Sequence, residues 1–166
     1  MLKLNLVSYF GIGVARDVER SIYYFKLSAY IHPISSFYLG KMYYEGEYIK
    51  HDMKKTIYYF KLSADQNNPE AQLYLGIIYL NEKSILFDIK KSIYYLTLAS
   101  NQNFNEAQLT LGCLYLQEKY SPININKALC LFSRAANNDH ELAQLVIGIL
   151  SINGIYMPQN IKKRIF

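Results

Sequence analysis

The chain has 166 residues, of which 51% are hydrophobic and 19% are charged, and its formal net charge is +5. This length and composition fit one folded domain and exclude an intrinsically disordered chain. The two cysteines are too few for a disulfide-rich scaffold. No long apolar run occurs, so we expect no membrane insertion, and the basic residues form no dense block that would call for nucleic acid.

The N-terminal stretch allows two interpretations. Residues 3–15 faintly resemble a secretory signal peptide, but the repeat register described below accounts for them better. No Asn-x-Ser/Thr sequon occurs in the chain. Together with the lack of a disulfide framework, this favours an intracellular protein, although the sequence names no compartment.

A Leu-Gly or Ile-Gly pair recurs every 36 residues, and a period of this size is typical of stacked helical repeats. The recurring glycines are Gly40, Gly76, Gly112 and Gly148. Small residues precede each glycine by five positions, and a tyrosine follows three of the four by three positions. This spacing predicts an amphipathic helix in each repeat, the A helix, with cap residues supplied near Asn68, Asn105 and Asp139.

A second helix, the B helix, is expected after a loop. Twelve residues beyond the glycine stands a good N-cap residue, which is Asp52, Asp88, Asn124 or Asn160. Helices are then predicted over 54–64, 90–100 and 126–136, each with an apolar face. The largest residues on these faces are Phe60, Leu96 and Phe132.

Glycine inside a helix costs about 1 kcal/mol relative to alanine. Four recurrences therefore need an offsetting gain, and the simplest is close approach of the B helix to the A helix at that point. We assign the four glycines this structural role.

The ends of the chain fall inside repeats. Residues 17–29 match 52–64 at a spacing of 35, which makes 1–10 a degenerate A helix, and a fifth B helix begins at Asn160 and stops at Phe166. The expected repeats are 1–32, 33–68, 69–104, 105–140 and the partial 141–166, forming a single solenoid over 1–166. Stacked repeats need polar caps, so we favour a fragment of a longer solenoid over homo-association through uncapped ends.

The third repeat carries Ala71, Leu75-Gly76, Tyr79, Asp88, Lys91, Tyr95 and Ala99, and the first carries Gly11-Ile12-Gly13-Val14 with Asp17. These residues resemble the motif of the Sel-one-like repeat family, a subclass of the tetratricopeptide-type helical repeats. The third and fourth loops lack the paired glycines of that motif, which leaves their shape open. The resemblance implies an all-α, right-handed superhelix of antiparallel helix pairs, with A helices on the concave side, and a largely non-catalytic adaptor function.

Positions three before, one after and four after each glycine are expected on a face of the A helix different from that of the glycine. They form a nearly continuous apolar stripe: Phe37, Lys41, Tyr44, Leu73, Ile77, Leu80, Leu109, Cys113, Leu116, Leu145, Ile149 and Ile152. The stripe could bind an amphipathic helix or an extended peptide. Burial of the same side chains against neighbouring A helices is an equally good interpretation.

Two further ladders follow the B helices. The outward positions carry Tyr23/Leu27, Tyr58/Leu62, Tyr94/Leu98 and Cys130/Arg134, which could support lateral association or be ordinary surface residues. Basic pairs recur at the helix starts, but Asp at the cap neutralises part of their charge, so phosphate binding is the weaker interpretation.

The sequence offers no catalytic, metal or cofactor motif. His32, His51 and His140 are isolated, and no phosphate-cradling loop or nucleophile elbow occurs. A cysteine-rich branch of the family is reported to bind β-lactams, but its paired cysteine spacing is missing. We therefore expect a non-enzymatic scaffold that binds a protein or peptide on its concave face, or alternatively a self-assembling solenoid.

Overall fold

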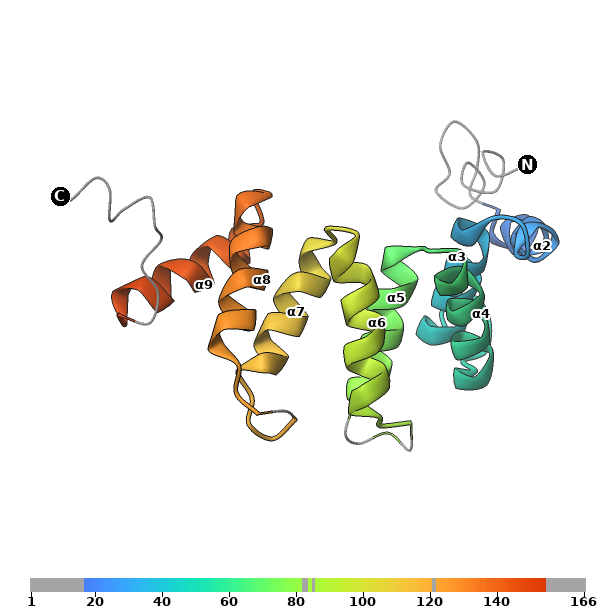
Figure 1. Ribbon diagram of the computed structural model, residues 1–166. Helices are drawn as coiled ribbons and strands as arrows, with labels where there is room; N and C mark the ends of the chain where they lie inside the picture. Colours follow the sequence, from blue (N-terminus) through green and yellow to red (C-terminus); the bar gives the residue numbers. More distant parts are fainter. Residues whose placement is uncertain (1–16, 82–83, 85, 121, 155–166) are drawn as a thin grey trace. The chain divides into compact units, whose positions relative to one another are not determined.

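A computed structural model of the chain describes residues 17–81, 84, 86–120 and 122–154 (Figure 1). The described residues form eight α-helices and no strand, which confirms the all-α fold. The expected first A helix and fifth B helix lie outside the described residues. The helices are α2 (Val18–Ser28), α3 (Pro33–Glu45), α4 (Met53–Asp65), α5 (Pro69–Leu80), α6 (Ile89–Asn101), α7 (Asn105–Tyr115), α8 (Ile125–Asn137) and α9 (Glu141–Ile152).

The helices alternate between the two expected types. The B helices are α2, α4, α6 and α8, and the A helices are α3, α5, α7 and α9. The chain divides into two compact units, residues 1–95 and 96–166, and the boundary falls within α6. In the first unit α3 lies beside α4, and in the second α7 lies beside α8 (Figure 1).

Each described A–B loop closes in the same way, whatever its sequence. The N-cap side chains of Asp52, Asp88 and Asn124 accept hydrogen bonds from backbone N–H groups three residues on, at 2.9–3.0 Å. The backbone N–H of each cap residue also donates to the carbonyl of the tyrosine nine residues earlier, at 2.8–3.1 Å. The predicted caps Asp52, Asp88 and Asn124 are thus confirmed, while Asn160 lies outside the described residues. The loops without paired glycines keep the same anchor.

The starts of the A helices differ in part from expectation. Asn68 caps α5 as predicted, accepting from the Ala71 N–H at 2.9 Å. The cap of α7 is Phe104, which makes no side-chain cap bond, so Asn105 is already helical. His140, rather than Asp139, caps α9.

Left-handed residues end the preceding B helices and explain this difference. Asn67, Asn103 and Asp139 have φ values of 66°, 60° and 60°. In each case the backbone N–H groups of this residue and the next turn back onto the last carbonyls of the helix, for example Asn67 to Ala64 and Asn68 to Ser63. This is a Schellman motif, in which Asn tolerates the left-handed conformation. Asp139 therefore belongs to the end of α8, and the residue that ends α6 is Asn103, two positions before Asn105.

A recurring glutamine, which sequence reasoning missed, ties three of the A helices, α5, α7 and α9, to the B helix before each. Gln72, Gln108 and Gln144 stand four residues before the glycines and donate to carbonyls eight residues earlier, at 3.2–3.3 Å. These carbonyls lie near the ends of the B helices, where intrahelical donors run out. The bonds hold successive helices together within each unit.

The close approach at the glycines is confirmed where the following B helix is described with it. A Cβ added at Gly40 would lie 2.5 Å from Phe60, and one at Gly112 would lie 2.5 Å from Phe132. Both phenylalanines are completely buried. At Gly76 the approach is polar, because the Ser92 hydroxyl donates to the Gly76 carbonyl at 2.8 Å. A Cβ added at Gly148 meets no described atom within 4 Å.

The difference between Gly148 and the other two glycines predicts stability changes of opposite sign for the same Gly→Ala substitution. Alanine at Gly40 or Gly112 forces a buried ring to move, and overpacking of this kind costs about 1–3 kcal/mol, which outweighs the helix-propensity gain of about 1 kcal/mol. Alanine at Gly148 keeps the propensity gain without the clash. We expect urea unfolding to show Gly40→Ala and Gly112→Ala destabilised and Gly148→Ala stabilised. Equal shifts for all three variants would contradict the close approach.

Candidate protein-binding surface

The residues around each glycine do not separate into the two faces expected from the sequence. In α3, the Phe37 and Tyr44 rings lie 5.8 Å and 6.5 Å from the Phe60 ring, measured between centroids. They therefore flank Gly40 and help to seat the ring that packs on it. The expectation that these positions face away from the glycine is wrong for α3, and Phe37 is buried in the core.

The position one residue after the glycine is the outward part of the A helix. Ile77, Cys113 and Ile149 occupy it and are all exposed, with Ile77 at 42% and Ile149 at 49%. Lys41, at the same position of α3, is half-buried and pairs with Glu45 at 3.6 Å. This position is exposed in α5, α7 and α9, whereas the other positions of the predicted stripe are exposed only at Tyr44, Leu145 and Ile152.

In the first unit this outward position is bordered by partly covered side chains. Leu73 and Leu80 of α5 are half-buried. Tyr74, which sequence reasoning missed, packs on Phe37, Tyr44 and Phe60 with centroid distances of 5.1–6.1 Å. An aromatic cluster thus fixes α3, α4 and α5 around the accessible residues.

In the second unit exposure increases towards α9. Leu109 and Leu116 of α7 are half-buried. On α9, Leu145 and Ile152 are 59% and 87% exposed. Leu142, absent from the expected stripe, is 58% exposed beside them. The outward residues of α9 therefore form the most open apolar face described in this unit.

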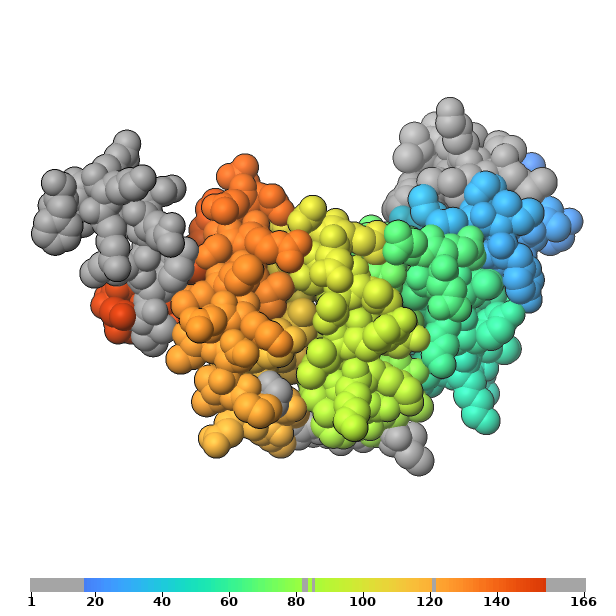
Figure 2. All heavy atoms as spheres, viewed as in Figure 1, coloured from blue at the N-terminus to red at the C-terminus, as the bar shows by residue number. Residues whose placement is uncertain are grey.

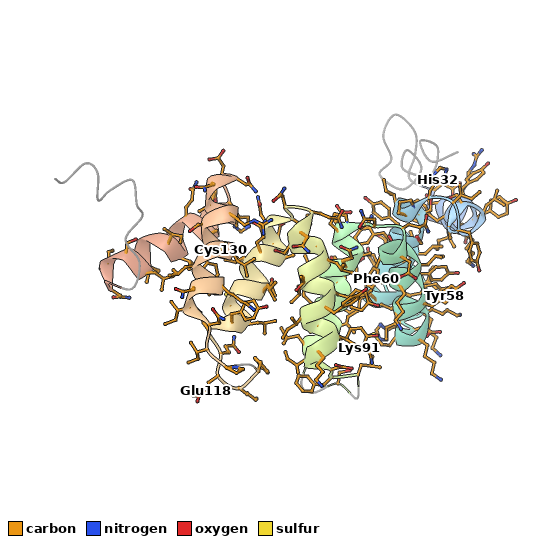
Figure 3. The ribbon with its side chains drawn as sticks, viewed as in Figure 1. His32, Tyr58, Phe60, Lys91, Glu118 and Cys130 are labelled. Atoms are coloured by element: carbon orange, nitrogen blue, oxygen red, sulfur yellow. The ribbon has the colours of Figure 1, made fainter. Side chains whose placement is uncertain are left out.

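The outward residues of the B helices are only partly exposed. Tyr58 points away from α4, while Phe60 points into the core (Figure 3). Tyr23, Leu27 and Tyr94 are exposed as well, but Leu62 is half-buried and packs against the core around Phe25. Tyr30, outside the expected ladder, hydrogen-bonds to Tyr58 through the two hydroxyl groups at 2.8 Å.

Arg134 holds the same place on α8 as Leu62 on α4, and it makes polar contacts. Its guanidinium donates to the Ser100 carbonyl at 3.1 Å and to Asn103 Oδ1 at 3.0 Å. Beside it lies an open hollow of about 210 Å³, bordered by Leu111, Tyr115, Lys127, Cys130 and Leu131 among others. α8 shows its outer side chains in the face drawn in Figure 2, where its atoms are orange.

The lysines at the B-helix starts are engaged within the fold. Lys55, Lys91 and Lys127 lie over the rings of Tyr43, Tyr79 and Tyr115, with Nζ 5.1–5.5 Å from the ring centroids. Such cation–π contacts stabilise the charge over the ring. Lys55 and Lys91 also pair with their N-cap aspartates at 3.6 Å and 2.9 Å. Because these lysines already contact tyrosine rings and aspartates, they make a poor phosphate-binding site.

The same contacts shift the ionisation of the caps. The side-chain and backbone hydrogen bonds from Lys91 lower the pKa of Asp88. In return, the hydrogen bond to Asp88 raises the pKa of Lys91. The backbone hydrogen bond from Lys55 likewise lowers the pKa of Asp52.

Groups that could support catalysis or metal binding are scattered in the described part of the chain. It contains no group of three or more His, Cys, Asp or Glu side chains that could hold a metal ion. Cys113 and Cys130 are both free and exposed. None of the helices described is long and apolar enough to cross a membrane.

The repeat geometry agrees with comparisons to known proteins. The Sel1 repeat family matches residues 5–30, 33–68, 69–104 and 105–140, and the chain therefore belongs to this family. Sel1 repeat proteins generally act as non-catalytic scaffolds for protein–protein interaction. No curated protein sequence matches the chain significantly.

Two solved structures share the fold. A Sel1 repeat protein from Oxalobacter formigenes is similar with a TM-score of 0.82 and 23% identity, over 89% of this chain and 61% of its own. A protective antigen from uropathogenic Escherichia coli strains, which displays an SLR fold, is similar with a TM-score of 0.79 and 23% identity, over 91% of this chain and 33% of its own. The chain thus spans less than two thirds of either relative.

The Asp88–Lys91 contact predicts a defined pH response. Because the folded-state pKa of Asp88 is lowered, its carboxylate stabilises the fold above the unfolded-state pKa, and this stabilisation disappears as the pH falls through the folded-state value. We expect Lys91→Met to move the Asp88 midpoint, measured by carboxyl NMR titration, up towards the ordinary value of 3.8. Lys90→Met is the matched control, because only the backbone of Lys90 contacts Asp88; an equal rise in both variants would contradict the assignment.

Proposed function

We propose that this chain is a non-enzymatic interaction scaffold, a single solenoid over residues 1–166 that binds a peptide or helix of another protein along its A helices. The observation that carries the proposal is the repeated exposure of an apolar residue one position after the glycine, at Ile77, Cys113 and Ile149. Burying such side chains against a partner yields about 25 cal/mol per Å² of apolar surface.

The residues beside Ile77, Cys113 and Ile149 favour a binding surface over ordinary scattered apolar residues. Leu73, Leu80, Leu109 and Leu116 each leave part of their surface accessible beside them, so a partner would meet a continuous apolar strip within each unit. The polar groups at Lys41 and Glu45 supply a charged margin. An apolar centre with a polar rim is the usual composition of an interface.

Self-association is a second candidate, favoured by one patch of the first unit. Tyr23, Leu27, Tyr30 and Ile31 are 52–73% exposed along one side of α2 and the turn after it. Tyr58 of α4 joins them through its hydroxyl contact with Tyr30. A patch with three tyrosines has the composition of a protein interface.

The two candidates are separated by paired variants. In affinity capture, Ile77→Asp combined with Cys113→Asp places charges on the outward positions of the A helices and is expected to reduce recovery of a bound protein at least tenfold, since about 1.4 kcal/mol is tenfold in affinity. Tyr94→Asp, an exposed residue of α6, is the matched control and should leave recovery unchanged. Unchanged recovery with a folded Ile77→Asp/Cys113→Asp protein would exclude the A-helix surface.

Light scattering tests the second candidate. If the α2 patch mediates association, the wild-type protein is a dimer or larger, and Tyr23→Asp with Ile31→Asp makes it monomeric. A wild-type monomer at high concentration would exclude self-association.

A further inference from the structure

A pair of stacked tyrosines covers the contact between the A and B helices in two of the repeats. Tyr43 of α3 stacks on Tyr59 of α4, with ring centroids 5.7 Å apart and ring planes 3° from parallel. Tyr79 of α5 stacks in the same way on Tyr95 of α6, at 5.9 Å and 7°. Tyr43 and Tyr79 are only 6% and 5% exposed. In both repeats, a ring carried by the B helix therefore covers the tyrosine of the A helix.

The fourth repeat keeps the first tyrosine of this pair and lacks the second. Tyr115 of α7 stands one period after Tyr79, and Lys127 Nζ lies 5.2 Å from its ring centroid, as Lys91 Nζ lies 5.5 Å from that of Tyr79. The B-helix position that carries the covering tyrosine in the other two repeats is Leu131 here. Tyr115 is half-buried rather than buried. A leucine leaves part of the space of a tyrosine side chain open beside it.

The hollow beside Arg134 lies at this place. It has a volume of about 210 Å³, and Tyr115 and Leu131 both border it, as does Cys130, which is labelled on α8 in Figure 3. All of its borders lie on α6, α7 and α8 between residues 97 and 134, within the second unit and away from both ends of the described chain. A protein cavity of about 150 Å³ is large enough to bind benzene. The hollow therefore has room for one phenyl-sized ring with a small substituent.

The charged groups at the hollow are all cationic. Lys127 and Arg134 border it, and no Asp or Glu does. The hydrogen bonds of Arg134 to the Ser100 carbonyl and to Asn103 both come from its Nη2 atom. A guanidinium has five N–H donors in a fork that matches a carboxylate, so Nη1 and Nε leave donors for an anion. Leu62 holds the place of Arg134 in α4, so the helix pair forms without a cation there.

We propose that this hollow binds a small aromatic carboxylate. The ring of the ligand stacks on Tyr115 in the place that Tyr59 and Tyr95 take in the other repeats. Its carboxylate pairs with Arg134, and Lys127 adds to the attraction. Aromatic rings gain from offset stacking beyond the burial of their area, and a carboxylate is the anion that a guanidinium binds through two parallel hydrogen bonds. An aliphatic acid would satisfy only Arg134, and a neutral aromatic molecule would satisfy only Tyr115.

The inference goes beyond the proposed function, because the ligand is a small molecule and no partner protein is needed. The hollow involves one repeat, whereas peptide binding is centred on the outward A-helix residues Ile77, Cys113 and Ile149, none of which borders it. The Ile77→Asp/Cys113→Asp protein should therefore bind the small molecule like the wild type. The two proposals can then fail separately.

Benzoate is the probe, titrated into the isotope-labelled full-length protein at neutral pH and followed by amide NMR shifts. We expect saturable shifts around Ser100, Tyr115 and Arg134 in the wild type. Leu131→Tyr restores the tyrosine of the other repeats and fills the hollow, and Arg134→Leu installs the residue of α4. Each is expected to raise the Kd about tenfold or more, the effect of losing one hydrogen bond to a charged group. Lys61→Leu is the matched control, because it removes an exposed charge of α4 outside the hollow, and it should keep the wild-type Kd.

Cyclohexanecarboxylate separates stacking from charge, because it carries the same acid group on a ring that is not aromatic. It is expected to bind about threefold more weakly than benzoate or worse, from the loss of aromatic stacking. Thermal unfolding checks that the variants are folded, and Leu131→Tyr is suited to the test because α4 and α6 already carry tyrosine at that position. An equal Kd for the wild type and folded Leu131→Tyr would overturn the proposal. So would wild-type shifts that stay linear up to the solubility limit of benzoate, or equal binding of the two acids.

Discussion

The close approach of a B helix to the glycine of the preceding A helix is the contact on which the repeat depends. Gly40 and Gly112 allow Phe60 and Phe132 to reach the backbone of the preceding A helix, and each ring is completely buried as a result. A side chain at either glycine would hold the two helices apart and expose the apolar faces of both. The helix-propensity cost of glycine, about 1 kcal/mol, is therefore small beside the burial that it permits.

Around this contact the chain repeats a set of polar links that fix where each helix begins and ends. The N-cap residue anchors the loop to a tyrosine carbonyl, the lysine three positions on lies over that tyrosine, and a glutamine joins the next A helix to the end of the B helix. These links satisfy backbone groups that helix ends leave free. They also account for the polar residues that recur with the period. A polar residue that recurs in every repeat is therefore explained by its structural contacts and is not by itself evidence of a binding site.

The period, both helix types, the B-helix caps and the role of the glycines could be predicted from the sequence, because each depends on local spacing. The Schellman turns at Asn67, Asn103 and Asp139 were missed, since an Asn or Asp before a helix resembles a cap and its φ value cannot be read from composition. The site was predicted less well than the fold. Phe37 and Tyr44 stand 60° and 40° around the helix from Gly40 at about 100° per residue, so they share its face, and Tyr74 joins them through tertiary packing that spacing does not encode.

One feature of the repeat thus has two consequences. The residue after the glycine faces away from the B helix and is exposed. It is Ile77 in α5, Cys113 in α7 and Ile149 in α9. The glycine itself faces the B helix, and it is covered by a buried ring at Gly40 and Gly112 and by the Ser92 hydroxyl at Gly76. The surface that helix packing leaves open and the surface that it closes therefore follow from the same local geometry.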